Sequence, residues 1–304
     1  IPFHSIPFHS IPFQPDQTMP FRFTGFADEA EKSLDGQIAT LKEAGWSAIE
    51  LRLVNGKSIC DQSEEEWTST RTTLAANGIE IVGFGGQIGN WARPVTSDFQ
   101  KDVEELRRVA PRMRSVGAKF LRIMSWPNDK DSPWDRAAWK DEVVKRLRQL
   151  APVAESEGVI LAHENCSGYG ESPEGFLELI EAVNSPAFKL IIDTGNNSLH
   201  HNSNEATWEY YSKCRDHIVH VHIKSAKPNP EGGDWITCHV DEDPVQRRIL
   251  GDLVRTGYDG WLSIEPHIKA AIHAGQDVDD TGEARRVWVE YTQRLEKLVK
   301  EITG

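Results

Sequence analysis

The feature that most constrains this chain is a regular alternation of two kinds of segment, from Phe21 to the C-terminal end. Short runs rich in β-branched or aromatic residues alternate with longer segments of helical periodicity, and the short runs predict eight strands. Eight strand–helix units in about 285 residues are the number and size of a (β/α)8 TIM barrel, an α/β fold with a single domain. The predicted strands cover residues 21–27, 48–54, 79–85, 119–125, 159–165, 188–194, 217–223 and 261–267.

Glycines support the boundaries of this alternation. The residues just before four of the predicted strands are those that a helix C-terminal cap favours: Gly45, Gly117, Gly158 and Gly257. A doubly wound sheet is the alternative arrangement, but no glycine-rich phosphate loop follows the first strand. The stretch GFGGQIG at residues 83–89 is only loosely similar to a dinucleotide-binding loop, and it lacks the acidic partner that such a loop needs.

The first residues differ from the rest of the chain. Residues 1–18 contain the unit IPFHS almost three times, and the proline in each repeat prevents a regular helix. The stretch lacks the charged and then apolar order of a signal peptide. We interpret residues 1–18 either as a sequence added before a natural start near Met19 or as an apolar arm that docks on a neighbouring subunit. We assign residues 19–304 to the barrel.

Composition excludes some classes of function. The 47 acidic and 34 basic residues give a formal net charge of −13, which repels phosphate backbones and argues against a nucleic-acid partner. No apolar run approaches the roughly 18 residues of a membrane span. The four cysteines are far apart and form no CxxC pair, which predicts reduced thiols and a cytoplasmic location.

Four predicted strands end in polar side chains that are costly to bury. The fifth strand ends in Glu164, the sixth in Asp193, the seventh in His222 and the eighth in Glu265. In a parallel barrel the carboxyl ends of the strands lie around one rim, where barrel active sites are found. We therefore expect these four side chains to converge. Three carboxylates at close range repel one another unless protons or a cation offset their charge.

A divalent metal ion is the simplest offset. Three oxygen ligands and one nitrogen, without a thiolate, suit Mn²⁺, Mg²⁺, Co²⁺ or Zn²⁺, and the ligand set alone does not choose among them. We expect one ion per chain, with Mn²⁺ as the first choice. Taken singly, each residue also has a structural explanation: a helix cap for Glu164, an Asx-turn for Asp193, a hydrogen-bonded core position for His222 and an arginine partner for Glu265.

Several stretches of the chain are distinctive beyond their strand or helix pattern. They are GFADEAEKSLDGQIATLKEAGWSAIELR near the start, followed by HENCSGYG, IIDTGN, HVHIKSA and GYDGWLSIEPH. With these stretches the chain resembles one bacterial sugar isomerase/epimerase branch of the xylose-isomerase-like superfamily of barrels. That superfamily contains sugar isomerases and epimerases, inosose dehydratases and, more distantly, endonuclease IV. The resemblance runs from about Phe23 to the C-terminal helix and implies a metal-dependent sugar enzyme.

This resemblance also implies roles for the four strand-end residues. The metal ligands of the family match Glu164, Asp193, His222 and Glu265. In keto-sugar epimerases the two glutamates also act as acid and base on opposite faces of the substrate carbon, and that role falls on Glu164 and Glu265. The chemistry is reasonable, because a metal-bound carbonyl and hydroxyl pair acidifies the adjacent C–H, and a nearby carboxylate can take the proton.

Three departures from the epimerase pattern leave the substrate open. Asn196 stands where many epimerases have a substrate-binding histidine, Pro228 where they have an arginine, and Ser225 where relatives have an acidic residue. Lys224 is retained, either to hold a substrate hydroxyl or an enediolate oxygen or as a surface cation. The substrate-binding candidates are Lys224, His220, Asn196 and Trp126.

Other residues near the predicted rim have weaker signals. His220 shares the face of His222, because side chains on a strand repeat every two residues, and it is expected to line the site or lie deeper. By the same alternation His163 should point away from the metal. Glu50 and Arg52 share a face near the end of the second strand. They are expected either to form a structural ion pair or to contact the substrate. Trp126 lies in a loop, where aromatic rings stack on sugars or pack locally.

Several functions remain open at this point. The first is a metal-dependent isomerase or epimerase that acts on a sugar or glycoside. The second is a lyase that uses the same deprotonation next to a 3-keto group, as a dehydratase or a glycoside-cleaving enzyme, in one case with a small partner subunit. An endonuclease IV-like nuclease lacks its extra histidine ligands here, and a non-catalytic sugar-binding barrel is the remaining alternative. The family implies a homo-oligomer, either a dimer or a tetramer.

Overall fold

The computed structural model describes residues 20–267 and 282–304. The predicted extension at residues 1–18 and the predicted start at Met19 lie outside the described residues. Eight parallel strands form a nearly closed barrel, in the order β1-β12-β9-β8-β7-β6-β5-β2, and β1 lies against β2. They are β1 (Arg22–Gly25), β2 (Ala48–Leu51), β5 (Glu80–Gly85), β6 (Phe120–Ser125), β7 (Ile160–Gly168), β8 (Phe188–Asp193), β9 (Ile218–Ile223) and β12 (Trp261–Ile264). The predicted (β/α)8 barrel is therefore confirmed.

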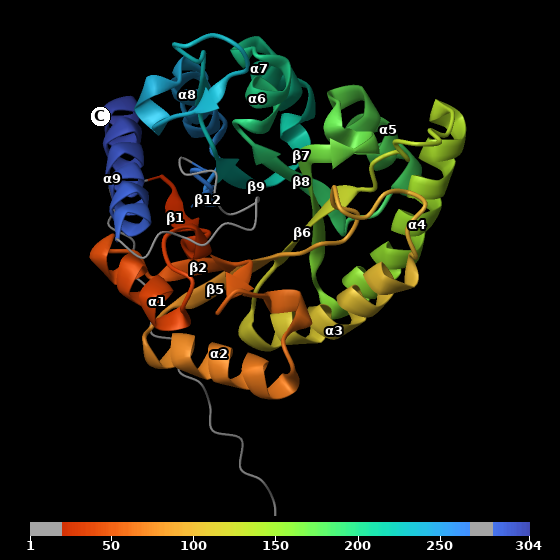
Figure 1. Ribbon diagram of the computed structural model, residues 1–304, viewed down its shortest axis with the longest axis horizontal. Helices are drawn as coiled ribbons and strands as arrows, with labels where there is room; N and C mark the ends of the chain where they lie inside the picture. The colour runs from red at the N-terminus through yellow and green to blue at the C-terminus, as the bar shows by residue number, and fades with distance from the viewer. Residues whose placement is uncertain (1–19, 268–281) are drawn as a thin grey trace, which may run out of the picture.

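Helices surround the strands on the outside, as Figure 1 shows. Most units have one helix, but β8 is followed by two. The helices are α1 (Leu34–Glu43), α2 (Glu64–Ala76), α3 (Gln100–Val116), α4 (Arg136–Glu157), α5 (Pro173–Val183), α6 (Asn196–His201), α7 (Asn204–Cys214), α8 (Pro244–Thr256) and α9 (Glu283–Thr303). Two short hairpins lie in loops on the carboxyl side of the barrel: β3 (Leu53–Val54) with β4 (Lys57–Ser58), and β10 (Ala226–Lys227) with β11 (Ile236–Thr237).

The helix ends follow from local chemistry. Gly117, Gly158 and Gly257 cap α3, α4 and α8 in the left-handed conformation, with φ of 78°, 68° and 77°. At the other end of a helix, Ser63 and Glu66 form a capping box on α2, in which each side chain accepts a hydrogen bond from the backbone N–H of the other residue. These caps set the chain direction back toward the barrel after each helix.

Side-chain alternation gives the strands an apolar outer face, and it directs the charged side chains of several strands into the barrel. On β7, Leu161 is fully buried in the apolar layer between strands and helices, whereas Glu164 contacts other charged residues inside the barrel. On β9, Val221 belongs to the apolar layer and His222 faces the interior. The barrel interior is thus a polar core, and its charges have to be compensated there.

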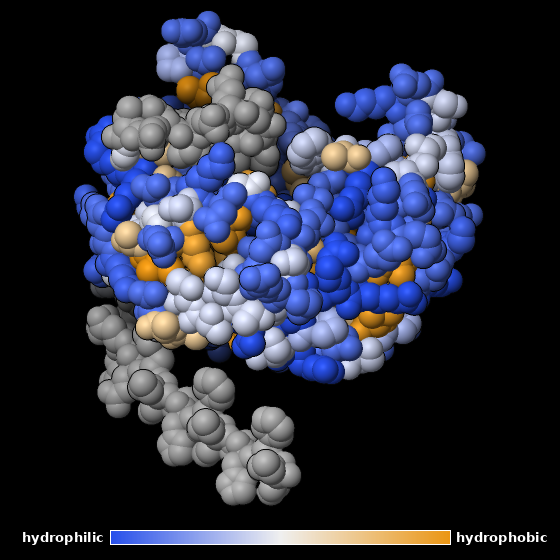
Figure 2. Space-filling view, turned by 60° about the horizontal axis from the view of Figure 1, so that its bottom comes forward, coloured by the Kyte–Doolittle hydropathy of each residue, from blue (hydrophilic) through white to orange (hydrophobic). Residues whose placement is uncertain are grey.

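The surface shows no large apolar area on the face seen in Figure 2, where apolar atoms lie in separate small patches among hydrophilic ones. Across the described residues the large hydrophobic side chains that are exposed are Trp91, Trp134 and Ile236. None of the described helices is both long enough and apolar enough to span a lipid bilayer.

Candidate active site

The structure brings together the four side chains that the strand ends predicted. Glu164 lies on β7, Asp193 ends β8, His222 lies on β9 and Glu265 follows β12. All four are buried, and each offers one ligand atom within 4.8 Å of the others. The convergence follows from the parallel register of the strands. Asp193 on β8 lies beside His222 on β9, and Ser263 on β12 lies on the other side of His222. Glu265 comes two residues after Ser263.

His222 is held between two carboxylates. Its Nε2 lies 3.1 Å from Oε2 of Glu50, and its Nδ1 lies 2.8 Å from Oε1 of Glu164. Burial opposes the charged imidazolium, but Glu50 and Glu164 raise the pKa of His222 to about 10. A proton therefore serves as counter-charge on this ring without a metal, and a metal ion bound at Nδ1 would displace it.

Glu50 is a buried charge behind His222. Besides His222, its carboxylate accepts hydrogen bonds from the hydroxyl of Ser263 at 2.6 Å and pairs with Nε2 of His220 at 2.8 Å. Burial would raise the pKa of Glu50, but His222 and His220 hold it well below its usual value. An ionised Glu50 fixes Nε2 of His222 as the protonated nitrogen and leaves Nδ1 toward the three strand-end carboxylates.

Lys224 and Asn196 complete the polar rim next to Asp193. The Lys224 ammonium lies 3.1 Å from Oδ2 of Asp193 and 3.2 Å from Oε2 of Glu265, and it donates to Oδ1 of Asn196 at 3.0 Å. The other oxygen of Asp193 accepts the backbone N–H groups of Gly195 and Asn196, both at 2.8 Å. This is the Asx-turn considered from the sequence. It uses only Oδ1 and leaves Oδ2 facing the site.

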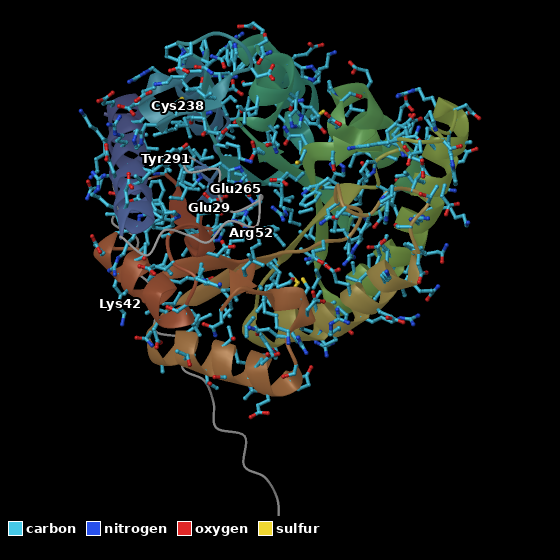
Figure 3. The ribbon with its side chains drawn as sticks, viewed as in Figure 1. Glu29, Lys42, Arg52, Cys238, Glu265 and Tyr291 are labelled. Carbon is cyan, nitrogen blue, oxygen red and sulfur yellow. The ribbon has the colours of Figure 1, made fainter. Side chains whose placement is uncertain are left out.

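Glu265 belongs to a second charge network on the β1–β2 side. Arg52 donates to Oε1 of Glu265 at 2.6 Å and to the carboxylates of Asp28 and Glu29 at 2.9–3.2 Å. His267 lies 3.1 Å from both Glu29 and Glu265. Burial would raise the pKa of Glu265, but Lys224, His267 and Arg52 hold it well below its usual value, so the carboxylate is ionised. Figure 3 shows Glu29, Arg52 and Glu265 close together near the centre of the barrel.

Two observations test whether a cation fits this cluster. Among the described residues, Oδ2 of Asp193 and Oε2 of Glu265 are buried and accept no hydrogen bond, although both form ion pairs with Lys224. The buried group also lacks positive charge: with all six carboxylates ionised and both His222 and His267 protonated, five positive charges face six negative ones. Burial accordingly raises the pKa of Asp28 and of Asp193. The six carboxylates and three permanent cations, all buried, are Asp28, Glu29, Glu50, Glu164, Asp193 and Glu265, and Arg52, Arg122 and Lys224.

The donor set of the cluster is therefore suited to a divalent cation. Ionised carboxylates and a neutral imidazole nitrogen are the ligands that such ions take in proteins. The residues that would hold it are Glu164, Asp193, His222 and Glu265, whose atoms converge. A cation at this point would supply the positive charge that the buried group lacks.

The remaining candidates lie around this centre at different depths. His220 is fully buried, stacks on Phe120 at 5.0 Å and pairs with Glu50, so it lies beneath the four ligand candidates. His163 points away from them, as expected, with its Nε2 2.9 Å from the hydroxyl of Ser125. Glu50 and Arg52 both form structural ion pairs, each with partners of its own.

Trp126 is not part of the cluster. Its side chain is fully buried, and its indole N–H donates to Oδ2 of Asp102 at 2.7 Å. The ring also lies 6.0 Å from that of Phe99. The sequence left two alternatives for this loop residue, stacking on a sugar or local packing. In this structure the indole packs locally and offers no exposed face to a sugar.

Sequence reasoning missed several charged residues of the site. Asp28 and Glu29 stand in the 3-10 turn after β1, His267 follows β12, and Arg122 lies in the middle of β6. Only Arg122 left a signal in the sequence, as a lone charge inside the apolar run KFLRIMS. The others lie outside any periodic pattern and reach the site through the fold.

Comparison with known proteins places the chain in a family. It matches the family described as xylose isomerase-like TIM barrel over residues 38–291, and it belongs to that family. Among curated proteins, none is similar to the chain in sequence.

Solved structures share the fold at low sequence identity. A xylose isomerase-like TIM barrel protein from Mycobacterium smegmatis in complex with magnesium is 18% identical, with a TM-score of 0.67 over 95% of this chain and 99% of that one. The probable 3-DHS dehydratase AsbF from Bacillus anthracis is 16% identical, with a TM-score of 0.67 over 90% and 98%. A D-psicose 3-epimerase from Clostridium cellulolyticum H10, solved with D-tagatose, is 15% identical, with a TM-score of 0.64 over 91% and 97%.

Proposed function

We propose that this chain is a divalent-metal-dependent sugar isomerase or epimerase that works by proton abstraction next to a carbonyl and hydroxyl pair. The observation that carries the proposal is the convergence of Glu164 and Glu265 with Asp193 and His222 on one point inside the barrel. The two glutamates come from non-adjacent strands, with β8 and β9 between them in the barrel. A substrate carbon between them therefore has a carboxylate on each side.

Each residue of the cluster has its own role in this reaction. When bound, the metal ion polarises the substrate carbonyl and hydroxyl and so acidifies the adjacent C–H. Glu164 or Glu265 takes the proton as a general base, and the other carboxylate, which first takes a proton from solvent, returns it to the opposite face. Lys224 and Asn196, which are hydrogen-bonded to each other at 3.0 Å, hold a substrate hydroxyl at the rim. Glu50 keeps the lone pair of His222 Nδ1 directed at the ligand position.

The family and its structural relatives support this class of chemistry. Among the relatives above, one is a D-psicose 3-epimerase and one a probable dehydratase. A lyase reaction at the same site begins with the same deprotonation and is the second candidate, favoured by the fold likeness to that dehydratase. The two differ in product, since an epimerase returns a saturated sugar and a lyase releases water or an aglycone.

Solvent exchange tests the proposal. Purified protein supplied with Mn²⁺ is incubated in D₂O with D-psicose, D-tagatose and a 3-keto glucoside, and the recovered sugars are analysed by NMR. We expect deuterium at one carbon next to the carbonyl of at least one sugar, lost in Glu164→Gln and in Glu265→Gln. Inversion of that carbon identifies an epimerase, and an unsaturated product identifies a lyase. Metal-loaded protein that exchanges no deuterium into any of these sugars contradicts the proposal.

We also propose Mn²⁺ as the bound ion, a cytoplasmic location and a homodimer or homotetramer. The cysteines support the location, since Cys60, Cys166, Cys214 and Cys238 are all free thiols. A small partner subunit is proposed only if the substrate proves to be a glycoside. Light scattering at several protein concentrations checks the oligomer, and a monomer at every concentration contradicts it.

A further inference from the structure

Arg122 occupies an inward position of β6 where both neighbouring strands carry small residues. In register it pairs with Gly85 on β5 and with Ala162 on β7. A Cβ atom at Gly85 would lie 3.1 Å from the ring of Phe26 and 3.0 Å from Cβ of Arg52, so this position of β5 is closely packed and has no side chain of its own. Gly85 and Ala162 thus give a long side chain room to rise along the barrel toward the rim.

The Arg122 guanidinium reaches the two proposed acid/base residues without binding either tightly. Its Nη1 lies 3.7 Å from Oε2 of Glu164 and 3.7 Å from Oε1 of Glu265. It lies over the ring of Phe26, at 5.4 Å from the centroid, and makes no hydrogen bond to another described residue. Its side chain is nonetheless 10% exposed, and its Nε is buried without a partner.

This situation differs from that of the other two cations of the site. Arg52 uses Nε and both terminal nitrogens on carboxylates, and Lys224 contacts Asp193, Glu265 and Asn196. Glu164 and Glu265 offset the charge of Arg122 at 3.7 Å, but no hydrogen bond within the described residues replaces those that its guanidinium would make in water. Such a group, directed between two catalytic carboxylates, is suited to an oxygen-bearing ligand.

We propose that Arg122 is a substrate-binding residue whose guanidinium donates hydrogen bonds to the substrate oxygen on which negative charge collects during proton abstraction. The inference rests on the proposed function. In that step the C–H bond breaks, the proton goes to a carboxylate oxygen of Glu164 or Glu265, and the electron pair moves into the carbon skeleton. The carbonyl oxygen gains the negative charge, and a cation fixed beside it stabilises the enolate without moving.

Binding of a planar dianion tests this inference apart from turnover. Oxalate has the coplanar oxygen pair and the charge of an enediolate, and its dissociation constant is measured by calorimetry on Mn²⁺-loaded wild type, Arg122→Met and Arg122→Lys. We expect the Met variant to bind oxalate about ten- to hundredfold more weakly, the range for a hydrogen bond to a charged group, and the Lys variant to fall between. Mn²⁺ affinity, read by EPR of the free ion, and the midpoint of thermal unfolding should stay near wild type.

Arg112→Met is the matched control. Arg112 is also buried, but on α3, where it donates to the backbone carbonyl of Gln62 at 2.9 Å and to Glu64 at 3.1 Å. Its loss should lower the unfolding midpoint and leave oxalate binding unchanged, which is the signature of a purely structural arginine.

The outcomes separate the inference from the proposed function. Equal oxalate affinity in Arg122→Met and wild type overturns the inference, as does metal-loaded wild type that binds no oxalate. A Met variant that loses Mn²⁺ or stability instead assigns Arg122 a structural role and also overturns it. In all three cases the metal site stands, whereas a wild type that retains no Mn²⁺ removes the proposed function itself.

Discussion

The two sides of the barrel interior treat their buried charges differently. On the β1–β2 side, Arg52 satisfies its donors on Asp28, Glu29 and Glu265. On the β6–β9 side, Oδ2 of Asp193 and Nε of Arg122 are buried without a hydrogen-bond partner in the described chain. Glu265 belongs to both sides, since Oε1 accepts from Arg52 while Oε2 accepts no hydrogen bond.

This difference indicates which residues serve the fold and which serve a ligand. A fully paired buried charge network is self-sufficient, and losing one member leaves the others uncompensated. Polar atoms that have no hydrogen bond in a closed interior cost free energy, and a bound ion or ligand is one explanation for them. The β1–β2 network therefore positions one oxygen of Glu265, and under the proposed function the opposite side would supply the ligand and substrate groups.

The largest effect should follow from breaking the paired side. Arg52→Met leaves Asp28, Glu29 and Glu265 without their shared cation, all of them buried. We expect a loss of about 3–5 kcal/mol in the free energy of unfolding, measured by urea denaturation of the metal-free protein. A loss below about 1 kcal/mol, the size of a surface ion pair, would show that this network is not the self-sufficient unit described here.

A change on the unpaired side should act on the ligand instead of on the fold. Asp193→Asn keeps the oxygen that accepts the N–H groups of Gly195 and Asn196 and replaces only the oxygen that faces Lys224 with an amide nitrogen. We expect Mn²⁺ affinity to fall by more than about 100-fold, beyond the range for residues behind the ligands, while the unfolding midpoint changes little. Unchanged Mn²⁺ affinity would remove Asp193 from the ligand set.

The smallest effect should come from the residue behind His222. Glu50→Gln keeps the shape but removes the charge that fixes the imidazole, so Mn²⁺ affinity should fall about 10- to 100-fold. Ser263→Ala is the matched control, because it removes only the hydroxyl that donates to Glu50 at 2.6 Å and should cost about 1 kcal/mol of stability. Equal loss of Mn²⁺ in both variants would mean that packing around Glu50, and not its charge, holds the ring.

The sequence predicted the barrel and the central four residues because both are set by local and periodic rules. Strand runs, glycine caps and the alternation of side chains fix which residues face inward, and the spacing of Glu164, Asp193, His222 and Glu265 by whole strand–helix units fixes the shared rim. These rules hold wherever the strands are parallel and in register.

The rest of the site depends on contacts between side chains from opposite parts of the barrel, and local sequence rules do not predict such contacts. Arg52 meets Glu265 over 213 positions of sequence, and Glu50 meets His222 over 172. Which of several inward charges pair is decided by side-chain length, strand tilt and small neighbours such as Gly85. For Trp126 the local rule also fell short. Its loop position suggested a sugar contact, but its indole N–H donates to Asp102, a partner that the sequence pattern did not indicate.

Metal content tests the central claim most directly. Protein purified without added metal, beside a Glu265→Gln variant prepared in the same way, is analysed by inductively coupled plasma mass spectrometry. The account predicts about one divalent ion per chain in the wild type, clearly reduced in the variant, since four converging ligands form one site. If the wild type contains no divalent metal and binds none when Mn²⁺, Mg²⁺, Co²⁺ or Zn²⁺ is supplied, the carboxylate cluster is not a metal site and the proposed chemistry is wrong.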